Sequence, residues 1–64
     1  MKIDRRKLDI ALARQDMTLA DVAKAVGVSA VTIRCQAASE SVLPKTAGRL
    51  AKAIGCDVTE IIED

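Results

Sequence analysis

Residues 18–37, with the sequence TLADVAKAVGVSAVTIRCQA, decide the fold of this 64-residue chain. In the first half of this segment, apolar side chains recur at the spacing of a helix with one buried face, and these are Leu19, Val22, Ala23 and Val26. Thr18 and Asp21 stand at the spacing of a capping box, which predicts that the helix starts there. Gly27 is its predicted end, because a residue without a Cβ atom adopts the left-handed conformation at no steric cost.

A second short helix is predicted directly after this turn. Ser29 is its expected N-cap. Val28 and Ile33 are expected to point inward. The outer side of the helix is then expected to carry Ala30, Val31, Arg34 and Cys35. Two short helices joined by a tight turn that contains glycine form a helix-turn-helix, and the second helix of this motif can enter the major groove of DNA.

The residues before this segment predict another helix. Asp4 is its expected N-cap, and the helix is expected to reach about Gln15 after a short lead-in of residues 1–3. Its inner face is expected to consist of Leu8, Ala11 and Leu12, with Ile10 at the margin. The helix-turn-helix is therefore preceded by a helix that can pack against it.

A fourth helix is predicted after residues 38–43, a stretch that loses the helical period and is expected to form a loop. Pro44 fits the first position of this helix, where its missing amide donor costs nothing, and Gly55 is its expected end. Gly48 lies inside the helix. We expect it to weaken the helix by ~1 kcal/mol relative to alanine, and to mark close packing against a neighbour.

The end of the chain completes the expected architecture. Residues 57–60, DVTE, repeat the capping pattern and predict a last short helix through Ile62. The chain is therefore expected to be all-α, a single domain of residues 1–64 in which five short helices pack around one aliphatic core. The sequence contains no aromatic residue, so this core is built from Leu, Ile, Val, Ala and Met.

Composition argues against several other classes of protein. The chain has no histidine and two cysteines, Cys35 and Cys56, so neither a disulfide scaffold nor a zinc site is expected, and two reduced thiols are favoured. A domain this small has no room for an enzyme cleft beside its core, and a Ser or Cys nucleophile would lack its usual base. We therefore expect no enzyme, no metal, no cofactor and no small-molecule ligand.

The sequence also predicts no membrane segment. No apolar run is long enough to cross a bilayer, and charged residues interrupt the N-terminus where a signal peptide would need an apolar stretch. The expected location is therefore the cytoplasm, of a bacterium or of a phage host.

The charges are unevenly distributed although their sum is only +1. Four of the nine acids fall in the last eight residues, namely Asp57, Glu60, Glu63 and Asp64. Residues 1–56 therefore carry ten bases and five acids. A basic body with an acidic tail is compatible with phosphate contact on one side, although a spread of Lys and Arg is also typical of a solvated surface.

Two stretches of the chain resemble one family. Residues 18–33, with the pattern T-x-x-D-V-A-x-x-V-G-V-S-x-x-T-I, are similar to the helix-turn-helix of the phage-repressor and Cro type, also called the xenobiotic-response-element family. Residues 44–62, PKTAGRLAKAIGCDVTEII, resemble the same family. The resemblance implies a lambda-repressor-like DNA-binding domain with its helix-turn-helix at the second and third helices. It also implies a transcriptional repressor that binds a palindromic operator in double-stranded DNA as a homodimer.

The same resemblance implies which residues would meet DNA. The base-facing positions are Ser29, Ala30, Val31 and Cys35, with Thr32 and Arg34 near the groove or the phosphates. The positions expected to hold phosphates at helix starts are Thr18, Leu19, Lys45 and Thr46. Arg34 supplies a long donor, whereas Ala30 and Val31 can pack only on a thymine methyl group. Cys35 is favoured to be only a small, weakly polar side chain on the helix surface. Redox control of DNA binding through oxidation of its thiol stays open as the alternative.

Residues 34–43 depart from the family pattern. Glu40 and Ser41 stand where basic residues are usual, Gln36 stands where a large apolar core residue is expected, and Leu43 replaces a capping serine. These differences favour an alternative function, an antitoxin-like or regulatory protein-interaction module that keeps the fold with weak or no DNA binding. Its contact surface would consist of Ala37, Ala38, Val42 and Leu43.

Overall fold

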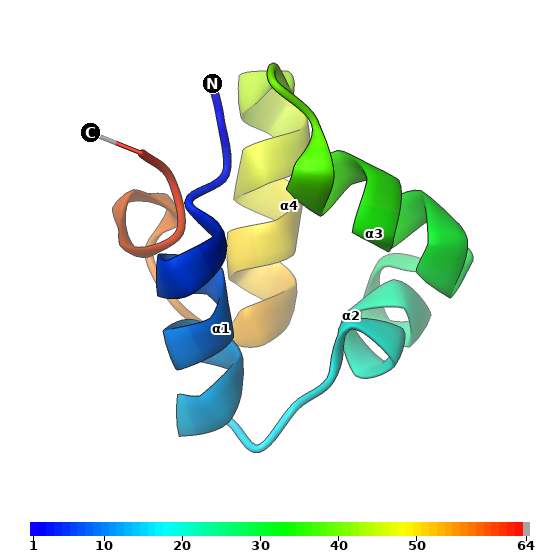
Figure 1. The fold of residues 1–64 in the computed structure, drawn as a ribbon. Coiled ribbons are helices and arrows are strands. Elements are labelled where there is room, and N and C mark those ends of the chain that lie inside the picture. The colour runs from blue at the N-terminus through cyan, green and yellow to red at the C-terminus, as the bar shows by residue number, and fades with distance from the viewer. Residues whose placement is uncertain (64) are drawn as a thin grey trace.

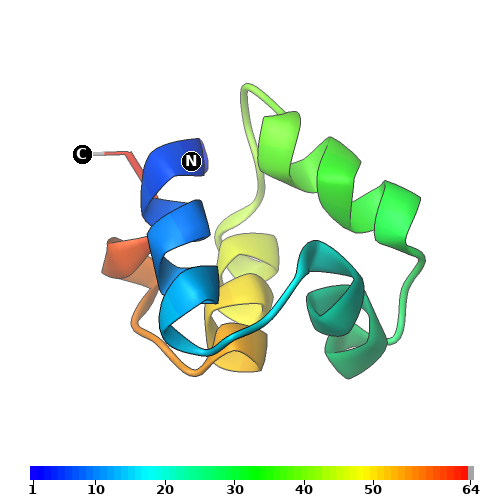
Figure 2. The same cartoon turned by 60° about the horizontal axis from the view of Figure 1, so that its bottom comes forward.

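The computed structural model of the protein describes residues 1–63, and this part of the chain is helical. Its elements are the α-helices α1 (Arg5–Arg14), α2 (Leu19–Val26), α3 (Ala30–Ala38) and α4 (Pro44–Ile54), followed by the 3₁₀ turn η1 (Val58–Glu60). Figure 1 shows α4 in the middle, with α1 and η1 on one side of it and α2 and α3 on the other, and the rotated view in Figure 2 keeps this order. The predicted all-α bundle is confirmed.

The helix boundaries follow from the residues that flank them. The Asp4 side chain caps α1 by accepting the Lys7 N–H at 3.1 Å. Gly27 and Gly55 end α2 and α4 with φ angles of +89° and +87°, in the left-handed region that favours glycine. These boundaries agree with those predicted from the sequence, because each depends on contacts within a few residues.

The predicted fifth helix is instead a single 3₁₀ turn. Asp57 caps it, and the Glu60 carboxylate closes the capping box by accepting the Asp57 N–H at 2.9 Å. After this turn the chain extends, and Ile62 forms an antiparallel bridge with Ile3. A continued helix would break this pairing and move Ile61, which is 0% exposed, out of the core.

An aliphatic core fills the space between the helices. Its buried members within residues 1–63 are Ile3, Leu8, Ala11, Leu12, Val22, Ala23, Ile33, Ala37, Val42, Ala47, Leu50, Ala51, Ile54 and Ile61. Ile33 points inward as predicted, but Val28 does not, since it is 40% exposed. Val28 follows the left-handed Gly27, and this turn carries its side chain to the surface.

The end of α3 and the segment that follows it contribute to this core, which corrects one prediction. Ala37 and Val42 are expected to offer apolar surface, yet they are only 4% and 8% exposed. Gln36, at the position where a large apolar residue is usual, is half-buried. Ala37 and Val42 therefore supply the apolar area that Gln36 does not, and residues 34–43 keep α3 attached to the bundle.

Gly48 lies inside α4 without the close neighbour that its small size suggests. A Cβ atom built on this residue meets nothing within 4 Å. The prediction of close packing is therefore wrong. The expected effect of Gly48 on stability therefore comes only from the lower helix propensity of glycine.

Replacing Gly48 with alanine should stabilise the protein by about 1 kcal/mol, because alanine fits the helical backbone and restricts the unfolded chain. Urea unfolding followed by circular dichroism measures the difference. Gly55→Ala is the matched control, since its φ angle of +87° disfavours a Cβ atom and the substitution should destabilise the fold. A less stable Gly48→Ala variant would contradict the open space found at this position.

Candidate nucleic-acid interface

The helix α3 presents one side to solvent because its other side is buried. Ile33 is 0% exposed and Ala37 is 4% exposed. The exposed residues of α3 and its N-cap are Ser29, Val31, Thr32, Arg34, Cys35 and Ala38, whereas Ala30 is half-buried. Figure 2 shows α3 at the edge of the molecule, with its outer side away from the other helices. The predicted base-facing residues are thus mostly accessible, and Ala30 is the partial exception.

The hydroxyl groups at the start of α3 are already engaged. Ser29 Oγ accepts the Thr32 N–H at 3.2 Å and is hydrogen-bonded to Thr32 Oγ1 at 2.9 Å. Val31, next to them, is 62% exposed. The outer side of α3 therefore presents the Val31 side chain and the Arg34 guanidinium group, beside two hydroxyl groups of which one O–H remains free to donate.

The start of α2 is fixed by a complete capping box. The Asp21 N–H donates to Thr18 Oγ1 at 3.2 Å, and the Thr18 N–H donates to Asp21 Oδ2 at 2.9 Å. The Thr18 N–H donating to the carboxylate lowers the pKa of Asp21, with a smaller contribution from the Thr18 side chain. Thr18 and Leu19 thus lie at a helix start as predicted, but Thr18 is occupied as a cap.

The start of α4 has a different chemistry. Its N-cap residue, Leu43, makes no capping hydrogen bond with its side chain, and Pro44 occupies the first turn. The amides of Lys45 and Thr46 belong to the first turn, where no acceptor exists within the helix. Lys45 is exposed and Thr46 is half-buried. This helix start therefore combines a cation with uncapped amide donors.

The structure brings the end of α3 and the start of α4 together around one cleft. Its volume is about 330 Å³, and it is lined by Cys35, Gln36, Ser39, Ser41, Val42, Leu43 and Thr46. Cys35 and Thr46, which the resemblance implicates at separate places in the sequence, thus border the same depression. The other eight predicted DNA-contacting residues do not line it, so the start of α2 and the first turn of α3 lie outside this cleft.

The charges near this cleft are of both signs. Within residues 1–63, Arg34 and Lys45 take part in no ion pair, so their charges are available. Glu40, whose side chain is 90% exposed, lies 3.5 Å from the Lys2 ammonium group. No local sequence pattern connects Lys2 with Glu40, because the two residues lie far apart along the chain.

The acidic tail is directed at cations of the N-terminal part of the chain. Glu60 pairs with Arg14 at 3.1 Å, and Glu63 pairs with Lys2 at 3.5 Å. Asp64 lies outside the described residues. Glu60 and Glu63 are therefore paired on the side of α4 that carries α1 and η1, whereas Asp57 caps η1.

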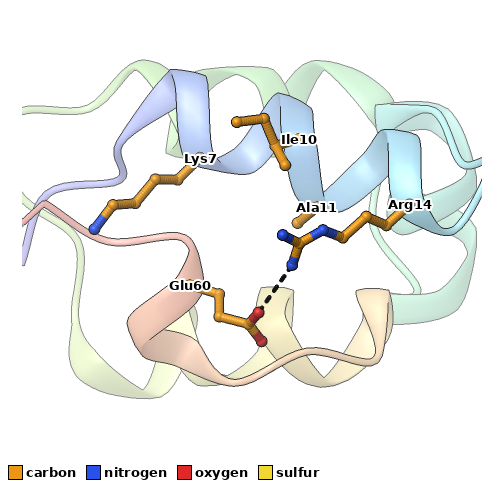
Figure 3. Close-up of a pocket in the computed structure, with 5 residues that line it drawn as sticks. All are labelled: Lys7, Ile10, Ala11, Arg14 and Glu60. Carbon is orange, nitrogen blue, oxygen red and sulfur yellow. Dashed lines mark hydrogen bonds and ion pairs between the residues drawn. The ribbon is translucent and has the colours of Figure 1, made fainter.

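A second cleft, of about 200 Å³, lies between α1 and η1. It is lined by Lys7, Ile10, Ala11, Arg14 and Glu60. Figure 3 shows the Arg14 guanidinium group directed at the Glu60 carboxylate across this cleft. Lys7 Nζ donates to the main-chain oxygen of Ile62 at 3.2 Å. Because both cations already have partners, this cleft is part of the packing of the C-terminal segment.

The remaining chemistry of the described chain is limited. Residues 1–63 contain no group of three or more residues that could hold a metal ion. Cys35 is exposed and Cys56 is half-buried, and both are free thiols. Burial, followed by the nearby Glu60 and Asp57 carboxylates, raises the pKa of the Cys56 thiol. In the same range no helix is both long and apolar enough to cross a membrane.

Comparison with known proteins assigns this fold to a class. A family model described as the Cro/C1-type helix-turn-helix DNA-binding domain matches residues 7–64. The chain therefore belongs to the Cro/C1-type helix-turn-helix family, which confirms the resemblance seen in residues 18–33 and 44–62. Searches among curated proteins and among solved structures found no match.

The capping box makes stability depend on pH. Because the pKa of Asp21 is lowered by folding, its contribution is fully present above the ordinary Asp value of about 3.9 and is lost as the pH falls through the lower folded value. Asp21→Asn should therefore reduce the loss of stability on acidification. Urea unfolding at a series of acidic pH values measures this loss in the wild type and in the variant.

Thr18→Ala is the comparison variant for this experiment. It removes the hydroxyl acceptor and should cost about 1 kcal/mol at neutral pH. It keeps the backbone N–H that is the main cause of the lowered Asp21 pKa, so most of the pH dependence should remain. If Asp21→Asn unfolds with the same pH dependence as the wild type, the capping box does not stabilise α2 as described.

Proposed function

We propose that the protein is a sequence-specific DNA-binding transcriptional regulator, which binds a palindromic operator as a homodimer and represses by occupying a promoter. The exposed outer side of α3 carries this proposal, since in a helix-turn-helix this helix enters the major groove. The two α3 helices of the dimer would lie about one DNA turn, ~34 Å, apart. The proposal requires no cofactor and places the protein in the cytoplasm with its DNA.

Base recognition in this proposal depends on apolar contact more than on hydrogen bonds. Val31 is 62% exposed and Cys35 is exposed on the same side, but neither is a strong hydrogen-bond donor. The Ser29 and Thr32 hydroxyl groups are engaged with each other. Arg34 therefore remains as the long donor, and methyl groups of thymine are the base atoms that Val31 fits.

Phosphate contacts would flank the recognition helix. The uncapped start of α4, with the Lys45 ammonium group and the Thr46 amide, offers positive charge and donors to one strand. The first turn of α2 offers amides to the phosphates on the other side of the groove. These contacts fix the orientation of α3 without reading the sequence.

A protein-interaction module is the second candidate, and one observation favours it, since Leu43 is 71% exposed. Two of the four residues expected to form its surface, Ala37 and Val42, are buried. The remaining patch of Ala38 and Leu43 is small for a protein interface, which needs about 800 Å² on each partner. DNA binding is therefore the better supported function.

Titration of labelled promoter DNA from the neighbourhood of the gene, followed by fluorescence anisotropy, tests the proposal. The affinity should fall linearly with salt on a double-logarithmic scale, because binding releases counterions. Lys45→Ala should weaken binding and reduce the slope by about one. At DNA concentrations far above the dissociation constant, two protomers should bind each duplex.

Lys52→Ala is the matched control, because it removes the same charge from the last turn of the same helix and should leave the slope unchanged. Equal effects of the two variants would show that Lys45 acts only through net charge. A wild-type protein without salt-dependent binding even at low ionic strength would contradict the DNA function. One protomer per duplex would contradict the homodimer.

Replacing thymine with uracil within the bound site should weaken binding by about fourfold per contacted base, since only the methyl group is lost. The measurement uses the same titration with substituted duplexes. The control is the same thymine-to-uracil substitution outside the bound site. In a Val31→Ala variant the uracil effect should largely disappear, and unchanged affinity of the wild type for all uracil duplexes would contradict the apolar readout.

A further inference from the structure

The first residues of the chain are attached to the loop that leads from α3 to α4. The Val42 N–H donates to the Met1 carbonyl oxygen at 2.6 Å, and the Met1 amino group donates to the Val42 carbonyl oxygen at 3.1 Å. In Figure 1 the N-terminus lies at the same end of the molecule as this loop. Ile3, which follows, is 2% exposed and pairs with Ile62. Residues 1–3 are thus a fixed part of the fold.

Lys2 lies between two acids on this fixed segment. Its ammonium group is 3.5 Å from a Glu40 carboxylate oxygen and 3.5 Å from a Glu63 carboxylate oxygen. These two carboxylates, Glu40 first, raise the pKa of Lys2. The Glu63 N–H also donates to the Lys2 carbonyl oxygen at 2.9 Å, which fixes the backbone of Lys2.

Glu40 is the acid that matters for the candidate interface. It stands in the loop between the last residue of α3, Ala38, and the first turn of α4 with Lys45. Its side chain is 90% exposed, so its charge is directed at solvent. Glu40 stands five residues before Lys45, so its carboxylate is expected to repel a phosphate bound at the start of α4, and added salt screens this repulsion.

We propose that Lys2 is a positioning residue of the DNA interface, which holds Glu40 of the loop of residues 39–43 in place and offsets part of its charge. This inference rests on the proposed DNA-binding function. Lys2 acts through Glu40 and touches no DNA atom itself. A residue at the start of the chain thereby sets the electrostatic potential at the start of α4.

The test is a double-mutant cycle between Lys2 and Glu40, read out as the dissociation constant for the duplex that the wild type binds. Lys2→Gln should weaken binding about two- to fivefold at low ionic strength, the range of an exposed ion pair, and less at high salt. Glu40→Gln should strengthen binding. In the Glu40→Gln background, Lys2→Gln should have a smaller effect, because the contact between Lys2 and Glu40 is already lost.

Two control variants separate this role from others. Lys2→Arg keeps the charge and should retain the wild-type affinity. Arg14→Gln breaks the Arg14–Glu60 ion pair between α1 and η1 with the same loss of charge, and should change the affinity less than Lys2→Gln does. Circular dichroism of each variant shows whether the measured protein is folded.

Three outcomes would overturn the inference. An equal loss in both Glu40 backgrounds would mean that Lys2 acts on DNA independently of Glu40, through its own charge or a direct phosphate contact. An unchanged affinity of Lys2→Gln would mean that Glu40 does not act on DNA. If the wild type binds no DNA, the proposed function fails and this inference fails with it, whereas the first two outcomes leave the DNA function intact.

Discussion

The outer side of α3 is free because Ile33 anchors the inner side. Ile33 is 0% exposed and shares the core with Val22 of α2 and Leu50 of α4. A helix of nine residues is not stable alone, so its position depends on this burial. Successive residues turn by about 100° around a helix axis, which places Val31 and Cys35, two positions on either side of Ile33, about 200° away from it. The same contact that holds α3 therefore directs these two side chains outward.

The parts of the fold that the sequence predicted are those that depend on neighbouring residues. The capping box of Thr18 and the left-handed end at Gly27 involve residues within four positions, and both are present. The bridge between Ile3 and Ile62 joins the two ends of the chain, and no local pattern indicates it. For this reason Ile3 of the expected lead-in belongs to the core, and the expected last helix is only the turn η1.

The same distinction applies to the candidate site. The exposure of Val31 and Cys35 follows from helical periodicity around Ile33 and was predictable. The sequence shows that Glu40 is an acid at a position where a cation is usual. It does not show that Lys2 is the ion-pair partner of Glu40. Sequence order contains the sign of each charge but not its distance from the others. Pairing across the fold therefore has to come from the structure.

The two helix starts expected to hold phosphates are not equivalent, and capping is the reason. At α2, the Thr18 hydroxyl and the Asp21 carboxylate satisfy two amide groups, and the negative charge of Asp21 weakens the attraction of the remaining first-turn amides for a phosphate. At α4, Leu43 offers no capping side chain, which costs about 1 kcal/mol of stability relative to a serine. The uncapped amides and Lys45 then face an anion without competition from a carboxylate in the same turn. In the proposed complex the start of α4 therefore contributes more to phosphate binding than the start of α2, and the loss of a helix cap is compensated by the charge of the DNA.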